Sequence, residues 1–180
     1  MTTCIALHDW ENTYIWSDGL TTNSTRRVKE NSVKFLQYSD YTIGWSGSVI
    51  VSQIIQLWHQ EIWVKSEEQV FSLKEILIHL MKEHKCNSSL KDTDLIIATK
   101  FGIYHYCWED ESFIKKEKYI CIWSGWNFAY WYLHAIEDVF QWDFKKVIRK
   151  YGWKELIQNA ILLSFRFDTG TNDTITSISL

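Results

Sequence analysis

The chain begins with residues 1–19, MTTCIALHDWENTYIWSDG, and this stretch decides the fold. Residues 2–7 form a short apolar run of strand type, and the polar residues 8–12 suit a turn. The strand pattern resumes at residues 13–16, and Asp18-Gly19 closes it. We therefore predict a β-hairpin whose first strand starts almost at residue 1.

A second hairpin follows a polar segment. Residues 21–31 are polar, and we expect irregular structure there. Residues 33–38 and 41–45 again have strand character, with Ser39-Asp40 as the turn between them. The first part of the chain is thus predicted to be all β.

From Ser48 the apolar period changes to steps of three and four residues, which indicates an amphipathic helix. Its apolar stripe consists of Val51, Ile54, Ile55, Trp58 and Ile62. A second helix is predicted after Ser72-Leu73-Lys74-Glu75, which has the form of a capping box, and it should end in residues 82–85.

Strands return at residues 95–99, 103–108 and 119–123, two helices follow at 127–140 and 153–165, and a last strand is expected at 174–179. Pairs of helices between antiparallel strand groups can cover both outer faces of two stacked sheets. The predicted fold class is therefore α+β, a four-layer αββα sandwich of two stacked, mainly antiparallel sheets.

Size and charge limit the possible functions. The 180 residues, 46% of them hydrophobic, suit one domain over residues 1–180. A net charge of -3 gives no positive field for phosphate backbones or anionic bilayers, so we expect no nucleic-acid or membrane partner. No secretory signal or bilayer-spanning apolar stretch is visible, and the four cysteines form no disulfide framework. These features favour a cytoplasmic protein.

Thr2 is a candidate nucleophile. Cellular aminopeptidases remove an initiator methionine when a small residue follows, so Met1 is expected to be lost. A threonine hydroxyl at a chain start can be activated by its own α-amine, whose reference pKa is about 7.7–8.0. Many proteins begin with Met-Thr by chance, so this pattern alone does not indicate an enzyme.

Other polar residues lie at the ends of predicted strands. Lys34 can pair with Asp18, and its charge would lower the pKa of a nearby hydroxyl, although it could also be an ordinary surface lysine. Gly44-Trp45-Ser46-Gly47 lies between a strand and a helix, where backbone amides can face an oxyanion. Ser124-Gly125 repeats that setting, and Asp168-Thr169-Gly170-Thr171 follows the last helix; both could be simple caps.

In this order, these elements resemble the proteasome β-subunit family, including its HslV-type threonine peptidases. The resemblance spans nearly the whole chain and is strongest over residues 2–47. It implies that Thr2 is the nucleophile, that Lys34 and Asp18 support it, and that Gly47 supplies the oxyanion-hole amide.

The resemblance extends to later residues. It implies that Ser124 lies near the amine of the nucleophile, and that Asp168 and Thr171 correspond to a late aspartate-x-x-serine element, with threonine in place of serine. Thr21, Trp45 and Val49 fall where the family binds substrate, and bulky side chains there would favour small substrate residues. One departure is Val51, where the family has an aspartate.

The resemblance also implies partners. They are an unfolded polypeptide substrate, further copies of the chain in a homo-oligomeric ring, and a separate ATP-dependent unfoldase. No cofactor or metal is expected. Two alternatives remain open, an N-terminal-nucleophile amidohydrolase acting on a small amide and a catalytically silent structural homologue. A zinc site at His84, Cys86, His105 and Cys107 is a further possibility, but its spacing is not a common chelating pattern.

Overall fold

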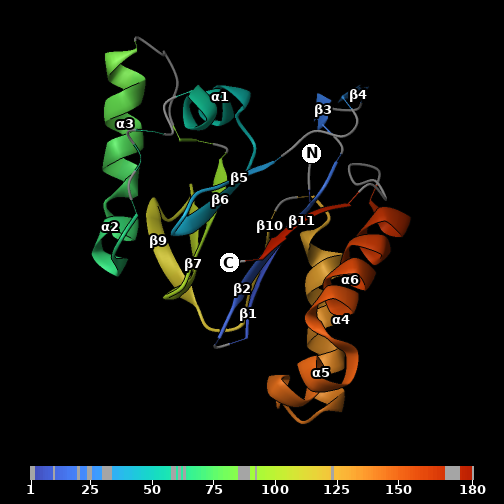
Figure 1. Cartoon of the computed structure of the whole chain (residues 1–180). Helices are drawn as coiled ribbons and strands as arrows, with labels where there is room; N and C mark the ends of the chain where they lie inside the picture. Colours follow the sequence, from blue (N-terminus) through green and yellow to red (C-terminus); the bar gives the residue numbers. More distant parts are fainter. Residues whose placement is uncertain are drawn as a thin grey trace.

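The computed structural model describes residues 3–9, 11–19, 21–23, 26–29, 34–57, 60, 62, 64–84, 90–91, 93–122, 124–168 and 175–179. Two antiparallel sheets form its centre (Figure 1). The four-stranded sheet has the order β10-β1-β2-β11, with β10 (Tyr119–Ile122), β1 (Cys4–His8), β2 (Thr13–Asp18) and β11 (Ile175–Ser179).

The second sheet has five strands in the order β5-β6-β7-β8-β9. They are β5 (Phe35–Gln37), β6 (Tyr41–Ser46), β7 (Asp94–Thr99), β8 (Gly102–Cys107) and β9 (Ser112–Lys116). Every neighbouring pair is antiparallel. A separate small hairpin is made of β3 (Thr21–Asn23) and β4 (Arg26–Lys29).

Helices cover the outer face of each sheet (Figure 1). Beside the five-stranded sheet lie α1 (Val49–Leu57), α2 (Glu67–Phe71) and α3 (Leu73–Glu83). Beside the four-stranded sheet lie α4 (Trp126–Val139), α5 (Phe144–Tyr151) and α6 (Trp153–Phe167). The predicted four-layer αββα sandwich is thereby confirmed.

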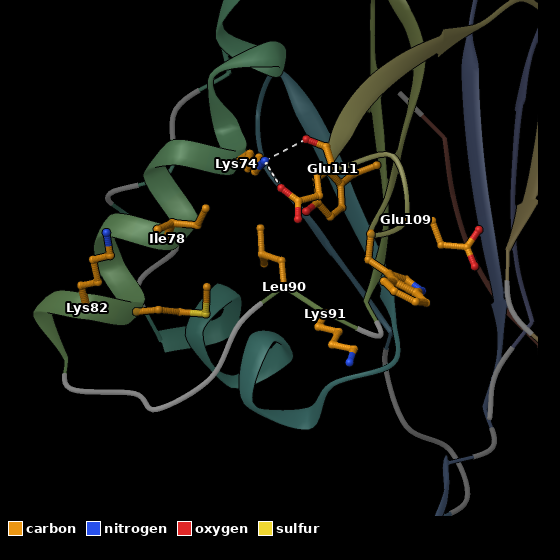
Figure 2. Close-up of a pocket in the computed structure, with 10 residues that line it drawn as sticks. Lys74, Ile78, Lys82, Leu90, Lys91, Glu109 and Glu111 are labelled. Carbon is orange, nitrogen blue, oxygen red and sulfur yellow. Dashed lines mark hydrogen bonds and ion pairs between the residues drawn. The ribbon is translucent and has the colours of Figure 1, made fainter.

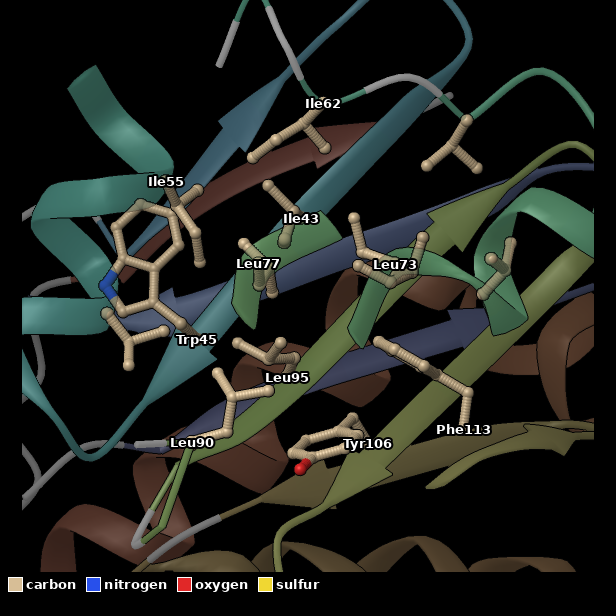
Figure 3. Packing of buried hydrophobic residues seen from close by; sticks show 14 of the residues in the cluster. Ile43, Trp45, Ile55, Ile62, Leu73, Leu77, Leu90, Leu95, Tyr106 and Phe113 are labelled. Atoms are coloured by element: carbon tan, nitrogen blue, oxygen red, sulfur yellow. The ribbon is translucent and has the colours of Figure 1, made fainter. Parts of the chain in front are cut away.

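The period-2 alternation of the strands creates three apolar layers. In β1, Ile5 and Leu7 face α4–α6, whereas Cys4 and Ala6 face the other sheet. The five-stranded sheet likewise packs on α1–α3, where Ile43, Trp45 and Leu77 meet (Figure 3). Because both faces of the central strands β1, β2, β6 and β7 are buried, a slip of one residue in their register would exchange the two layers.

Several local predictions were wrong. Strands β3 and β4 occupy a segment expected to be irregular, and β9, α2 and α5 were not predicted. The helices α2 and α5 span only five and eight residues, which is too short for a clear helical period. None of the helices in the described part of the chain is long and apolar enough to cross a membrane.

The expected capping box is also absent. Ser72 has helical backbone angles, because α2 ends directly before it, and its side chain makes no cap bond. Its hydroxyl instead donates to the Glu68 carbonyl oxygen within the preceding turn. The first helix ends at Leu57, although its apolar pattern continued to Ile62.

Candidate active site

An ion pair joins the two sheets at one end of the sandwich. Asp18 is the last residue of β2, and Lys34 directly precedes β5. Lys34 Nζ donates to Asp18 Oδ1 at 2.9 Å, with Asp18 0% and Lys34 4% exposed. The predicted Lys34–Asp18 pair is therefore present, and it is buried.

The same carboxylate holds the start of β1. The Thr3 N–H donates to Asp18 Oδ1 at 2.8 Å, and the Asp18 N–H donates to the Thr3 carbonyl oxygen at 3.0 Å. Asp18 Oδ1 thus accepts from an ammonium and from a backbone amide at once. Thr2, the predicted nucleophile, lies outside the described residues.

Burial shifts the pKa values of two residues in this site, Lys34 and Cys4. It lowers the pKa of Lys34, although the charge of Asp18 and their hydrogen bond act in the opposite direction. Burial also raises the pKa of the neighbouring Cys4 thiol to about 12, and the charge of Lys34 opposes this shift. The site therefore combines a desolvated ammonium with a thiol that stays protonated.

Gly44 allows the two sheets to approach each other here. A Cβ at this position would lie 2.7 Å from Ile15 Cδ1 and 3.2 Å from Cys4 Sγ, so only glycine fits without movement. Gly44 pairs with Phe35, and the Trp45 N–H donates to the Lys34 carbonyl oxygen at 3.1 Å. The close approach thus brings the backbone that carries Lys34 to the β1–β2 hairpin.

Gly47 lies between the end of β6 and the start of α1 and has a φ of 102°. This positive φ is open to glycine at low cost and rare for other residues. The neighbouring Trp45 packs with Ile55 in the core over the five-stranded sheet (Figure 3). The structure therefore gives Trp45 a packing role. The side chains of Thr21 and Val49 lie outside the described part of the structure.

A second polar pair lies where α4 begins and α6 ends. Ser124 Oγ donates to Asp168 Oδ2 at 2.7 Å, although the two residues are 44 positions apart. Ser124 lies two residues after Ile122, and Ile122 pairs with Cys4. Ser124 and Thr3 are therefore at the same end of the paired strands β10 and β1. Thr171 lies outside the described residues.

Comparisons with solved structures identify the fold. HslV from the eukaryote Trypanosoma brucei has a TM-score of 0.72 and 18% sequence identity, and the match covers 99% of each chain. This chain has the HslV-type fold. BPH from Thiobacillus denitrificans has a TM-score of 0.80 and 16% identity, covering 99% of this chain and 97% of that one.

BPH in complex with epoxomicin, another solved structure, has a TM-score of 0.79 and 16% identity, covering 99% of this chain and 98% of that one. No protein-family model and no curated protein sequence matches the chain. The evidence for the HslV-type fold therefore comes from the three-dimensional comparison.

Two residues of the site were missed by sequence reasoning. They are Thr3 and Cys4, which hold or neighbour the Lys34–Asp18 pair. Gly44 was predicted only as part of a loop that could face an oxyanion, although a glycine inside a strand often marks a close approach of two backbones, as it does here. Thr3 carried no signal, since its role is played by a backbone amide.

A cavity elsewhere in the HslV-type fold is separate from this site. It has a volume of about 600 Å³ and lies between α3 and the β8–β9 end, where Lys74 binds Glu111 (Figure 2). Its wall includes Ile78 and Leu90 (Figure 2). The cavity opens on the helix-covered face of the five-stranded sheet, away from the Lys34–Asp18 pair.

The two histidines considered for a zinc site have other roles in the structure. His105 Nε2 lies 3.3 Å from Asp94 Oδ1 in the sheet, and His84 caps the end of α3. Cys86 lies outside the described residues. Among the residues described, no group of three or more histidine, cysteine, aspartate or glutamate side chains could hold a metal ion.

Proposed function

We propose that this chain is an N-terminal threonine peptidase in which Thr2 is the nucleophile after removal of Met1. The observation that supports it is the buried Lys34–Asp18 pair. Asp18 binds the N–H of the peptide group that joins residues 2 and 3. A nearby cation favours the ionised form of a nucleophilic hydroxyl, and Asp18 links Lys34 to Thr3, the residue that follows Thr2.

In the proposed acylation step, Thr2 Oγ attacks the carbonyl carbon of a peptide bond and the Thr2 α-amine accepts the hydroxyl proton. The ammonium of Lys34, held by Asp18, stabilises the ionised hydroxyl. The Gly47 N–H stabilises the tetrahedral oxyanion. The C–N bond then breaks, and the proton passes from the amine to the leaving nitrogen.

Water completes the cycle. It adds to the ester carbonyl while the Thr2 amine takes a proton from it, and the C–O bond to Thr2 breaks as that proton returns to Oγ. The products are a carboxylic acid and the free hydroxyl. We place Ser124, Asp168 and Thr171 beside the amine as positioning groups, supported by the 2.7 Å bond between Ser124 and Asp168.

We further propose unfolded polypeptide as the substrate, a homo-oligomeric ring as the assembly and a separate ATP-dependent unfoldase as a partner. The likeness to HslV of T. brucei supports this part of the proposal. Activity should rise with pH as the Thr2 amine loses its proton, around the reference pKa of about 7.7–8.0, because only the neutral amine can accept the hydroxyl proton.

The test is covalent labelling with epoxomicin, a ligand that BPH of T. denitrificans binds. We expect one adduct, mapped by peptide mass spectrometry to an N-terminal Thr2, and an intact mass lighter by one methionine. Thr2→Ser should keep the labelling and Thr2→Ala should abolish it. An adduct at another residue, equal labelling of Thr2→Ala, or full retention of Met1 in native protein would defeat the proposal.

A further inference from the structure

The structure alters the expectation about the substrate at the candidate site. Trp45 was expected to contact substrate, but its side chain packs with Ile55 in the core over the five-stranded sheet (Figure 3). Successive side chains of a strand point to opposite faces, so the next residue of β6, Ser46, faces the four-stranded sheet. The side chain directly before Gly47 on this inner face is therefore small and polar.

Two further polar residues share this face. Asp94, the first residue of β7, pairs with Ser46 across the ladder. It lies two residues before Ile96, which belongs to the layer between the sheets. His105 of β8 follows the inner-layer residue Ile103 in the same way, and its Nε2 lies 3.3 Å from Asp94 Oδ1. Ser46, Asp94 and His105 thus form one polar group on three adjacent strands.

This polar group lies at the end of the sheet that carries the candidate site. Ser46 lies between Trp45, whose N–H donates to the Lys34 carbonyl oxygen, and Gly47. Directly paired residues of a sheet have Cβ atoms about 4.5–5.5 Å apart. Asp94 is therefore close to the segment that carries Gly47, and a long side chain of a substrate bound at the Gly47 N–H can reach its carboxylate.

The Ser46 hydroxyl indicates that this polar group takes a ligand. Ser46 is 3% exposed, and none of the residues that the structure describes makes a hydrogen bond with its hydroxyl. A buried hydroxyl without a partner is unfavourable, so a ligand that supplies a partner here is favoured. The Asp94 side chain is 14% exposed, so part of its carboxylate stays open to the same ligand.

Charge indicates the class of ligand. The Asp94 carboxylate and the Ser46 hydroxyl both accept hydrogen bonds, and an ammonium or guanidinium group offers several N–H donors. The nearby charges of Lys34 and Asp18 compensate each other. A carboxylate would be repelled by Asp94, and an apolar side chain would leave the Ser46 hydroxyl without a partner. The polar group therefore suits a cationic side chain.

We propose that Asp94 is a specificity-determining residue, and that the site prefers peptides in which lysine or arginine supplies the carbonyl group that is attacked. This inference rests on the proposed peptidase function and adds its substrate class. His105 is a positioning residue, because its ring holds one oxygen of the Asp94 carboxylate.

The test uses three fluorogenic peptides that differ only in the residue before the cleaved bond, which is arginine, leucine or glutamate. The unchanged chain should cleave the arginine peptide with the highest kcat/KM and the glutamate peptide with the lowest. Asp94→Asn should lower kcat/KM for the arginine peptide about ten-fold or more and change that for the leucine peptide by less than about two-fold.

The matched control is Asp40→Asn, which removes the same charge from the exposed turn between β5 and β6, at the other end of β6. It should leave the ratio of kcat/KM for the arginine and leucine peptides unchanged. An unchanged ratio in Asp94→Asn, or an equal loss for all three peptides, would overturn the proposal, because the carboxylate would then have a structural role only.

His105→Gln tests the positioning role. It should raise KM for the arginine peptide about three-fold at unchanged kcat, because it loosens the hold on the Asp94 carboxylate and leaves the proposed nucleophile in place. A fall in kcat for all three peptides would show instead that His105 only supports the fold.

The failure of this inference can be told from a failure of the peptidase proposal. A chain that labels at Thr2 with epoxomicin and cleaves the leucine peptide as well as the arginine peptide refutes the specificity alone. A chain that neither labels nor cleaves any of the three peptides refutes the peptidase function, and the specificity with it.

Discussion

Lys34 and Asp18 lie 2.9 Å apart and are both buried, so one ion pair joins the strand that ends the first hairpin to the strand that starts the second. A buried charge without its partner is strongly unfavourable, whereas the pair as a whole contributes little net stability.

Removing one partner of this pair should therefore be costly. We expect Lys34→Met to lower the free energy of unfolding in urea by about 3–5 kcal/mol, because it leaves the Asp18 carboxylate buried. The double variant Lys34→Met/Asp18→Asn should lose less than the sum of the single variants, since no lone charge remains.

The control for this prediction is the exposed pair of Lys74 and Glu111, whose atoms are 3.0 Å apart. Lys74→Met should cost about 0–1 kcal/mol. Strictly additive effects of the Lys34 and Asp18 substitutions would show that the two charges are not coupled.

Gly47 gives a prediction about backbone strain. An alanine at its φ of 102° should lower the free energy of unfolding by about 1–3 kcal/mol and, under the proposed mechanism, should also lower peptide turnover. Gly102, the first residue of β8, has a φ of 130° and pairs with Thr99, at the end of the sheet opposite to Gly47. Gly102→Ala should thus be destabilising with turnover retained, and equal loss of turnover in both variants would contradict a special role for the Gly47 amide.

Gly44→Ala should force the two sheets apart. The new methyl group would lie 2.7 Å from Ile15 Cδ1, and overpacking of this kind costs about 1–3 kcal/mol. Ile15→Val removes that Cδ1 atom. In the Gly44→Ala background it should therefore restore stability, although on its own Ile15→Val is destabilising. Thermal unfolding of the four proteins measures the coupling, and purely additive melting temperatures would refute the close contact.

The Cys4 thiol should make the protein sensitive to alkali. Its pKa is raised from 9.0 to about 12 in the folded chain, so above pH 9 the unfolded chain loses a proton that the folded chain keeps. Stability is then lost as pH rises from about 9 to 12, by up to about 1.4 kcal/mol per pH unit.

The measurement compares the unchanged chain with Cys4→Ala by urea unfolding under reducing conditions at several pH values. The variant should lose less stability as pH rises. The difference between the two proteins isolates the thiol from Lys34, whose lowered pKa acts with the opposite sign. Parallel pH profiles would show that the thiol ionises equally in both states.

Much of this structure follows from local sequence patterns. The alternation of residues 2–18 predicted the first hairpin, and periodic apolar residues predicted α1, α3, α4 and α6 with small errors at their ends. The positions of Asp18 at a strand end and Lys34 at a strand start predicted their pairing. The catalytic roles given to these residues stay predictions.

Other features depended on segments that are distant in the sequence. The short helices α2 and α5 and the strand β9 lack a period of their own and are held by neighbouring elements. The bond between Ser124 and Asp168 exists because α4 and α6 pack together. The sequence by itself determined which residues are apolar, polar or small along each element, since period and propensity are local properties. Only the tertiary structure decided which side chains meet, that Gly44 lies against Cys4, and that Trp131 of α4 is exposed, because packing is set by contacts that no local pattern encodes.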